Sequence, residues 1–337
     1  MFNRIEWVKS LLERKDAGKV LPILSYPGGQ LIGASIGQLV KDSKLQAMAM
    51  QAVAERTNSA ASVSFMDLSV EAECFGAQLV FSDDEVPTVT HSVVTSPEEI
   101  DSLEVPAVSS CRAPVYVEAV RIAKNNITDR PVFAGVIGPF SLAGRLLDVN
   151  EAMFYCYDEP EALKRLLDKT TRFLENYINE YKRAGADGVV VAEPLAGLLS
   201  PEFAERFSEP FVRRLAQLQE DNFIVIYHNC GNETVKMLPS ILRTGCSCYH
   251  FGNAVDMGDV LAGMPSDVIA MGNIDPAGQF CNGSEESVYR CTKQLMERLC
   301  DKYPNFVISS GCDIPYHADW KNIQSFFNAV SDYYNGK

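Results

Sequence analysis

Eight short apolar segments, spread along the whole chain and separated by helical patterns, limit the folds open to this sequence more than any other feature. They are rich in β-branched and aromatic residues, are bounded by turn-forming residues, and span 20–27, 61–67, 131–138, 187–194, 222–230, 247–253, 267–275 and 305–313. Between most of them, as at 161–185 and 284–302, apolar residues recur at intervals of three and four, which is typical of amphipathic helices. Strands that are apolar throughout and alternate with helices are typical of a covered parallel sheet. The sequence therefore predicts an α/β fold, a single (β/α)8 TIM-type barrel.

One connection is too long for a simple β/α unit. It covers about 68–130, after the second strand, and contains VEAECFGAQLVFSDDEVPTVTHSV at 70–93. This stretch predicts an inserted hairpin and loop region. Because no low-complexity linker or internal repeat divides the chain, we expect residues 1–337 to form one domain.

Composition excludes several classes of protein. The formal net charge of -14 opposes binding to nucleic acid, which needs a clustered positive field. The first residues, MFNRIEWVKSLLERKD, lack the apolar core of a signal peptide, and no apolar run approaches the length of a membrane span. We therefore expect a cytoplasmic protein without membrane contact, whose 10 cysteines are mostly reduced.

Polar residues gather where the predicted strands end. In a barrel of this type the carboxyl ends of the strands form the active site, so these residues are the candidates for function. They are Asp67, Glu193, His228, Cys230, His250, Asn253, Asn273, Asp275, Cys312 and Asp313.

The most specific subset is His228, Cys230 and Cys312. His228 and Cys230 project from the same face because residues two apart in a strand share a face, and Cys312 follows 82 residues after Cys230. An imidazole and two thiolates favour zinc, and three protein ligands leave a fourth position open, as in catalytic zinc sites. From spacing alone, a buried histidine with two unrelated core cysteines remains an equal alternative. The nearby pair Cys246 and Cys248 falls at the amino end of its strand and is expected to pack in the core.

Several blocks of sequence, in order, resemble one known family. They are FMDLSVEAECFGAQLVF (65–81), GPFSLAGRLL (138–147), AGADGVVVAEP with LLSPEFAERFSEPF (184–211), YHNCG (227–231), MGNIDP (271–276) and SSGCDIP (309–315). Together they make the chain similar, over nearly its whole length, to the uroporphyrinogen decarboxylase superfamily. Within it, the chain resembles the branch of methylcobamide:coenzyme M methyltransferases.

This resemblance implies a methyltransferase that holds zinc through His228, Cys230 and Cys312. It implies methylcobamide as co-substrate, carried on a separate corrinoid protein or free, because the chain has no D-x-H-x-x-G corrinoid motif. The other substrate would be a thiol such as coenzyme M, or another acceptor such as tetrahydrofolate, and a homodimer is left open.

Four further residues receive weaker assignments. Glu193 is a candidate fourth zinc ligand or an orienting partner of His228, with a structural ion pair as an equal alternative. Asp67 matches the pyrrole-binding aspartate of the decarboxylase branch, and its role here is open. Asn273 and Asp275 are candidates for contact with substrate or cofactor, or for shaping the turn after their strand.

The decarboxylase branch itself fits less well. It typically carries an arginine-rich segment after the first strand that grips the substrate carboxylates, whereas SYPGGQLIGASIG (25–37) contains no arginine. Two alternatives stay open. One is a metal-free lyase acting on a smaller carboxylic acid through Asp67 and Tyr227, and the other is a non-catalytic corrinoid-binding or scaffold protein.

Overall fold

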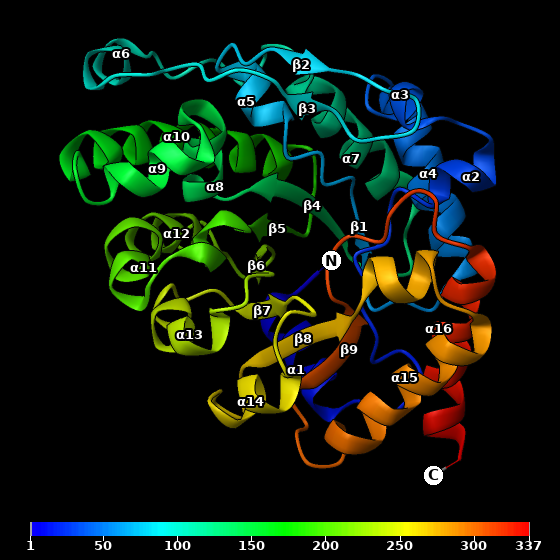
Figure 1. The fold of residues 1–337 in the computed structure, drawn as a ribbon. Coiled ribbons are helices and arrows are strands. Elements are labelled where there is room, and N and C mark those ends of the chain that lie inside the picture. Colours follow the sequence, from blue (N-terminus) through cyan, green and yellow to red (C-terminus); the bar gives the residue numbers. More distant parts are fainter. Residues whose placement is uncertain (1, 337) are drawn as a thin grey trace.

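A curled parallel sheet of seven strands forms the centre of the protein. The computed structural model describes residues 2–336 and orders the strands β1-β4-β5-β6-β7-β8-β9, each parallel to its neighbours (Figure 1). Their bounds are Ser62–Val63, Val132–Ile137, Gly188–Ala192, Ile224–Asn229, Cys248–Phe251, Ile269–Ile274 and Phe306–Ser310. The predicted parallel α/β architecture is confirmed, and each of these strands lies within one of the predicted segments.

The prediction of an eighth strand at 20–27 is wrong. This segment forms only an isolated parallel bridge between Val20 and Ile308 of β9. It still spans the gap between the two edges of the sheet, because Leu21 N donates to Ile308 O at 3.0 Å and Ala60 N donates to Val20 O at 2.8 Å. Pro22 has no N–H and cannot donate to a ladder, which explains why regular pairing does not continue.

Helices cover the outside of the sheet. The longer ones are α1 Arg4–Glu13, α4 Ser43–Arg56, α7 Ala113–Asn126, α8 Pro139–Leu147, α10 Pro160–Arg183, α12 Glu209–Ala216, α13 Thr234–Arg243, α15 Glu285–Leu299 and α16 Trp320–Asn335. The shorter ones are α2 Gly28–Ile32, α3 Ile36–Leu39, α5 Val70–Cys74, α6 Pro97–Ser102, α9 Val149–Tyr155, α11 Pro201–Phe207, α14 Met257–Ala262, the 3-10 helix η1 Leu195–Leu198 and the π-helix η2 Pro276–Cys281. α10 and α15 realise the predicted helices at 161–185 and 284–302. No helix within residues 2–336 has the length and apolar content needed to cross a bilayer.

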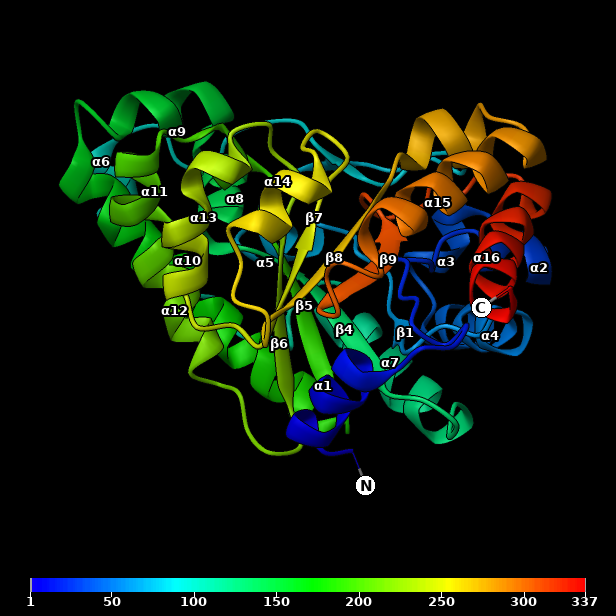
Figure 2. The same ribbon diagram turned by 90° about the horizontal axis from the view of Figure 1, so that it is seen from below.

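Alternate residues of the strands fill the interior of the curled sheet. One buried cluster collects Leu21, Ile23, Val63, Phe133, Val190, Ala192, Ile224, Ile226, Cys248, Ile269, Met271 and Val307. At the amino ends of the strands, α1 closes this interior (Figure 2). Trp7 packs edge-on against Phe133 with ring centroids 5.3 Å apart, and Leu11 is fully buried. With that end closed, a ligand must enter from the carboxyl ends.

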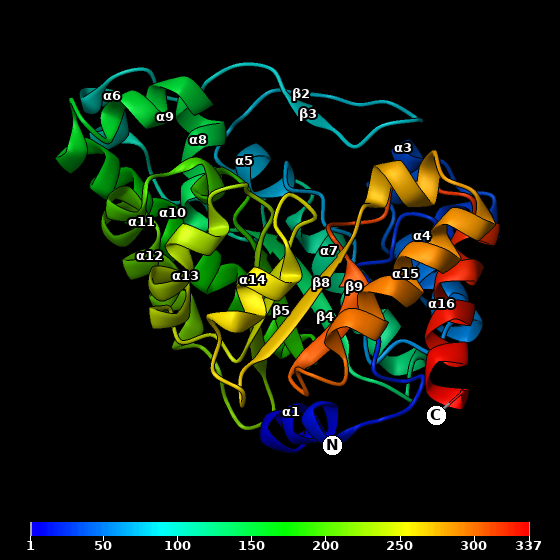
Figure 3. The ribbon, with the colours of Figure 1, turned by 60° about the horizontal axis from the view of Figure 1, so that its bottom comes forward.

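The long connection after β1 lies at the carboxyl ends. It contains α5 to α7 and two antiparallel strands, β2 (Leu79–Val80) and β3 (Thr88–Val89). Figure 3 shows β2 and β3 at one end of the molecule and α1 at the other. The turn between β2 and β3 is held to the body by Ser35 Oγ, which donates to Asp83 Oδ1 at 2.8 Å.

Candidate metal centre

The side-chain alternation that fills the interior also places the first two candidate ligands. In β6, Ile224 and Ile226 face the interior core, so His228, two residues further on, extends the same row beyond the apolar layer. His228 is 1% exposed. Cys230 follows at the end of β6 and is half-buried. The predicted pairing of these side chains on one face is consistent with this placement.

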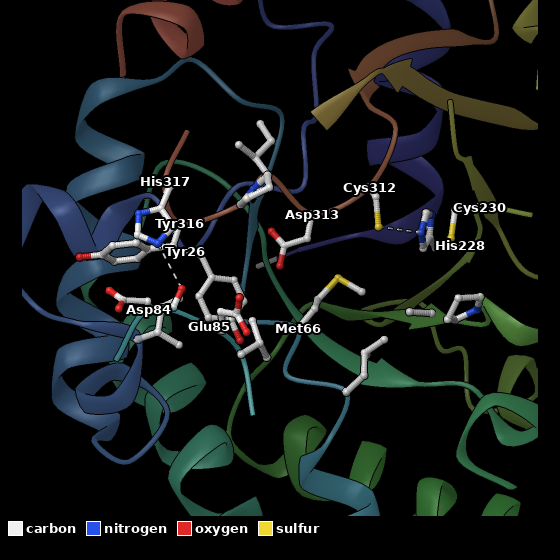
Figure 4. Close-up of a pocket in the computed structure, with 17 residues that line it drawn as sticks. Tyr26, Met66, Asp84, Glu85, His228, Cys230, Cys312, Asp313, Tyr316 and His317 are labelled. Atoms are coloured by element: carbon white, nitrogen blue, oxygen red, sulfur yellow. Dashed lines mark hydrogen bonds between the residues drawn. The ribbon is translucent and has the colours of Figure 1, made fainter. Parts of the chain in front are cut away.

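Cys312 reaches the same point from a different strand of the sheet. It follows β9, and its Sγ lies 3.5 Å from His228 Nε2. Ligand atoms of His228, Cys230 and Cys312 all lie within 4.8 Å of one another (Figure 4). The fold thus brings together three residues that the sequence separates by up to 84 positions.

Two glycines permit this close approach. A Cβ added to Gly252 would lie 2.5 Å from the Cα of Cys230, so the chain after β7 passes directly against the cysteine. A Cβ on Gly311 would lie 2.7 Å from the backbone N of Asn253. Larger residues at either position would displace the backbone that carries a thiol.

Behind His228 lies a second buried histidine. His250 of β7 is the register partner of His228, and the two Nδ1 atoms are 2.8 Å apart. His250 Nε2 lies 2.7 Å from Ser309 Oγ, and Ser309 Oγ donates to Leu21 O at 2.6 Å. All three side chains in this row are at most 1% exposed.

The row determines which ring nitrogens carry protons. Burial, and after it the neighbouring His228, lowers the pKa of His250 well below its usual value, so its ring is neutral and has one proton. Ser309 uses its only proton on a carbonyl, so it must accept a hydrogen bond from His250 Nε2–H. His250 Nδ1 then accepts from His228 Nδ1–H. His228 Nε2 is left with a free lone pair directed to Cys312, as a metal ligand requires.

The pKa values of the two thiols shift in opposite directions because the thiols interact with each other. The hydrogen bond from Cys312 lowers the pKa of Cys230 to about 7, against the effect of burial. The same interaction, together with burial, raises the pKa of Cys312 to about 12. Two converging sulfurs and an imidazole lone pair form a soft donor set that fits zinc and not magnesium or calcium.

Asp67 lies in a different environment from the one expected of a free catalytic carboxylate. Its Oδ2 contacts Arg112 Nη1 at 2.5 Å and accepts from Tyr116 OH at 2.7 Å, while its Oδ1 accepts from Ser69 Oγ at 2.5 Å. It is 4% exposed and does not line the cavity beside the cysteines. The structure therefore gives Asp67 the role of tying the end of β1 to the start of α7.

Glu193 is also occupied elsewhere. Its Oε1 accepts from Phe140 N at 2.8 Å and its Oε2 from Ser141 N at 3.0 Å, at the start of α8. Burial raises its pKa to about 7, although these hydrogen bonds oppose the shift. The partner of His228 Nδ1 is His250, so the expectation that Glu193 orients His228 is not met. A carboxylate at a helix N-terminus is stabilised by the local N–H groups and the helix dipole.

Asp275 shapes the turn after β8, which is one of the two predicted alternatives, whereas Asn273 fixes the turn after β7. Asn273 Nδ2 donates to Gly252 O at 2.9 Å and to Val255 O at 2.8 Å. Asp275 caps η2, accepting from Ala277 N at 3.0 Å. Neither residue lines the cavity beside the cysteines.

The residue pair named for a metal-free lyase does not meet. Tyr227 alternates with His228 and faces outward from the sheet, where Asn229 Nδ2 donates to its OH at 3.0 Å. Neither Tyr227 nor Asp67 borders the cavity. Cys246 and Cys248 are both buried in the core, as predicted.

A cavity of about 430 Å³ opens beside the candidate ligands. His228, Cys230 and Cys312 line one end, and the rest of the wall comes from Tyr26, Ile36, Met66, Leu68, Asp84, Glu85, Val86, Ala192, Pro194, Asp313, Ile314, Pro315, Tyr316 and His317. His250 is among the polar residues that the sequence placed at the strand ends, whereas Ser309 and Tyr26 were not singled out as site residues. For Ser309 the period-two pattern carried the signal, because it lies two residues beyond the interior core residue Val307.

A comparison with models of protein families identifies the family of this chain. The model of the family described as uroporphyrinogen decarboxylase (URO-D) matches residues 23–333. The chain belongs to the uroporphyrinogen decarboxylase family. The predicted resemblance is thereby confirmed.

Two relatives are similar in sequence, and one solved structure shares the fold. The chain is 27% identical over 297 residues to a methylated-thiol–coenzyme M methyltransferase of Methanosarcina mazei, covering 86% of this chain and 77% of the relative. It is 26% identical over 273 residues to the methylcobamide:CoM methyltransferase MtbA of the same species, covering 79% and 78%. A solved methyltransferase from Methanosarcina mazei superposes with a TM-score of 0.85 at 21% identity, covering 99% of this chain and 100% of that one.

Proposed function

We propose that this member of the uroporphyrinogen decarboxylase family is a zinc-dependent methyltransferase that moves a methyl group between a methylcobamide and a thiol. The observation that carries the proposal is the convergence of His228, Cys230 and Cys312 at one end of a cavity. Two relatives are named as methyltransferases of methylated thiols or methylcobamide and coenzyme M. These names support the same class of reaction.

The chain's own residues have distinct tasks. His228 Nε2 offers a lone pair, because the hydrogen bonds through His250 and Ser309 orient the ring of His228. Cys230 and Cys312 offer sulfur ligands. Zinc bound there supplies a Lewis acid that keeps a substrate thiol deprotonated at neutral pH. The largely apolar cavity wall excludes water around the reacting sulfur, which preserves its nucleophilicity.

The reaction itself is a direct displacement. The substrate thiolate attacks the methyl carbon of methyl-Co(III) cobamide, a sulfur–carbon bond forms, and the carbon–cobalt bond breaks. The electron pair of the broken bond stays on the metal as Co(I), so the products are a thioether and the reduced cobamide. The cobamide carries the hard chemistry, and the protein supplies position and a dry environment. A separate corrinoid protein is the proposed carrier.

Zinc content and methyl transfer test the proposal together. Purified wild-type protein is expected to hold about one zinc per chain by elemental analysis, and Cys230→Ala and Cys312→Ala to lose it, because a site with two protein ligands binds far more weakly. Cys246→Ala, at a core cysteine outside the cluster, is the matched control and should retain the metal. Zinc-loaded protein should also convert methylcobalamin to cob(I)alamin in the presence of thiols, followed by absorbance. Protein purified without chelator that contains no metal, or activity that survives chelation, would contradict the proposal.

A further inference from the structure

The cavity wall next to the metal ligands is apolar. Ala192 of β5 is the register partner of His228, so its methyl group lies beside that ligand on the interior face of the sheet. Met66, Leu68 and Ile314 continue the wall with aliphatic or thioether side chains. When a thiol binds at the ligand end, its tail therefore leaves water for a hydrocarbon-like surface.

The wall also lacks a fixed positive charge. No lysine or arginine from residues 2–336 lines the cavity, and its carboxyl groups are those of Asp84, Glu85 and Asp313. A carboxyl group is either neutral or negative, so none of the three attracts an anion in any protonation state. His317 is exposed, and its Nε2 lies 3.2 Å from Asp84 O.

An anionic tail would find no countercharge from elsewhere in the site. Arg112, in the inserted region, is committed to ion pairs with Asp67 at 2.5 Å and Glu73 at 2.6 Å. A zinc ion at the proposed site is balanced in charge by the two cysteine thiolates that would hold it. Because burying an unpaired charge is strongly unfavourable, thiols with a sulfonate or carboxylate tail should bind poorly.

A cationic tail gains little in compensation. Asp84 and Glu85 are exposed, in the turn between β2 and β3, and Figure 4 shows them away from the metal ligands. Ion pairs with exposed carboxylates contribute little, since water screens them. Asp313 Oδ1 is fully buried. An ammonium group beside Ala192 and Met66 would thus lose its water without an accessible partner.

Building on the proposed function, we infer that the thiol substrate has an uncharged, apolar tail, as in an alkanethiol. Methyl transfer to it yields an alkyl methyl thioether. The cavity selects against charged tails, including that of coenzyme M, 2-mercaptoethanesulfonate. In this respect the substrate differs from the coenzyme M in the names of the relatives.

Four thiols that share an S–C–C skeleton and differ in the terminal group test the inference. They are 1-propanethiol, 2-mercaptoethanol, 2-aminoethanethiol and 2-mercaptoethanesulfonate. Zinc-loaded full-length protein is assayed with each thiol and methylcobalamin at pH 8, where an ordinary imidazole is neutral. We expect kcat/KM to be at least tenfold higher for 1-propanethiol than for either charged thiol, with 2-mercaptoethanol between them. Calorimetric titration with the corresponding methyl thioethers, which have no thiol to ionise, should give the same ranking without turnover.

One variant tests the contribution of charge. Glu85→Lys puts a cation in the cavity wall, so the ratio of kcat/KM for the sulfonate to that for 2-mercaptoethanol should rise at least threefold at low ionic strength. Comparing this ratio between variant and wild type cancels differences in intrinsic thiol reactivity. Glu6→Lys makes the same change in net charge at an exposed position on α1, at the opposite end of the sheet, and should leave the ratio unchanged.

A second variant tests the contribution of the apolar wall. Met66→Gln replaces a thioether by an amide of similar length, so the ratio of kcat/KM for 1-propanethiol to that for 2-mercaptoethanol should fall at least threefold. Met48→Gln, at an exposed position on α4 outside the cavity, is the matched control. If Met66→Gln does not fold, Glu85→Lys decides, because Glu85 is exposed.

The outcomes separate this inference from the function on which it rests. A wild-type preference for either charged thiol, or for 2-mercaptoethanol over 1-propanethiol, overturns the apolar tail and leaves the methyltransferase intact. Ratios that do not move in the folded wall variants overturn it as well, because the wall then does not select the tail. Zinc-loaded protein that methylates none of the four thiols, and binds none of their thioethers, overturns both.

Discussion

At the scale of single residues, the hydrogen-bonded side chains of His250 and Ser309 prepare His228 to act as a metal ligand. His250 and Ser309 touch no substrate, yet they leave His228 Nε2 unprotonated and directed to Cys312. Without them His228 could rotate or carry its proton on the wrong nitrogen. They are therefore positioning residues of the proposed zinc site.

Loss of this support should weaken zinc binding. His250→Ala and Ser309→Ala are expected to lower zinc affinity by about 10- to 100-fold, the usual effect of removing a partner of a ligating histidine. Competition with a chromophoric chelator measures the affinity, and the ligand-field spectrum of the cobalt-substituted protein reports the geometry. His91→Ala, at an exposed histidine, serves as control. Wild-type zinc affinity and an unchanged cobalt spectrum in both variants would refute the role of the row.

Glu71 provides a prediction about pH. Burial raises its pKa to about 7, only partly opposed by the hydrogen bond from Ile137 N, and its Oε2 has no partner. Since the folded pKa lies above the unfolded one, the contribution to stability is complete below about pH 4.5 and is lost as pH rises through about 7.

Glu71→Gln should remove this loss. The amide keeps an acceptor for Ile137 N and carries no charge, so the variant should be more stable than the wild type at pH 8 by on the order of 1–3 kcal/mol. At pH 5 the difference should nearly vanish. Urea unfolding at both values is the measurement, and a variant equally destabilised at pH 5 and pH 8 would show that packing, not ionisation, dominates.

At the scale of elements, a buried ion pair connects β1 to the inserted region. Arg112, just before α7, bonds Asp67 and stacks over Phe81, which follows β2. The pair thus joins the sheet, a covering helix and the inserted strands beside the cavity. This connection accounts for the burial of the Asp67 carboxylate shortly after β1.

Removal of Arg112 alone should lower the free energy of unfolding more than removal of both charges of the Arg112–Asp67 pair. Arg112→Met leaves Asp67 buried and unpaired and should lower the free energy of unfolding by about 3–5 kcal/mol. The double variant Arg112→Met with Asp67→Asn should recover part of that loss, because the fully buried carboxylate is then neutral and only the partly exposed Glu73 loses its cation. Chemical denaturation of the wild type, Arg112→Met, Asp67→Asn and the double variant measures the coupling. Equal losses in the single and double variants would mean that the charge is not effectively buried.

At the scale of the whole molecule, the proposed metal site lies at the edge of a large core and is not its organising centre. The interior of the sheet is filled by apolar side chains and closed by α1 at the opposite end from the cysteines. A metal here is expected to stabilise by mass action alone. This contrasts with small zinc domains, which unfold without their metal.

Metal-free protein should therefore remain folded. After treatment with a chelator, its circular dichroism spectrum is expected to match that of the zinc-loaded form. Zinc at about 1,000 times its Kd should add about 4 kcal/mol to the free energy of unfolding, seen as a higher melting temperature. Loss of secondary structure on chelation would show instead that the site holds the fold together.

The sequence by itself determined the features that depend on local pattern. Apolar runs alternating with helical periods specify a parallel α/β sheet, and the spacing of His228 and Cys230 places both on one face, because these properties arise within a few residues of the chain. Residues 20–27 mark a limit of that reasoning: their composition suggests a strand, but Pro22 interrupts the ladder.

Only the tertiary structure decided which polar side chains are free and which are committed. The sequence left the roles of Asp67 and Glu193 open, and in the structure Arg112 and the start of α8 occupy their carboxylates. The partners that settle such roles come from other strands and helices, between 22 and 288 positions away for the row from His228 to Leu21. Hydrogen bonds and burial across such separations exist only once the sheet has curled, so no local pattern encodes them.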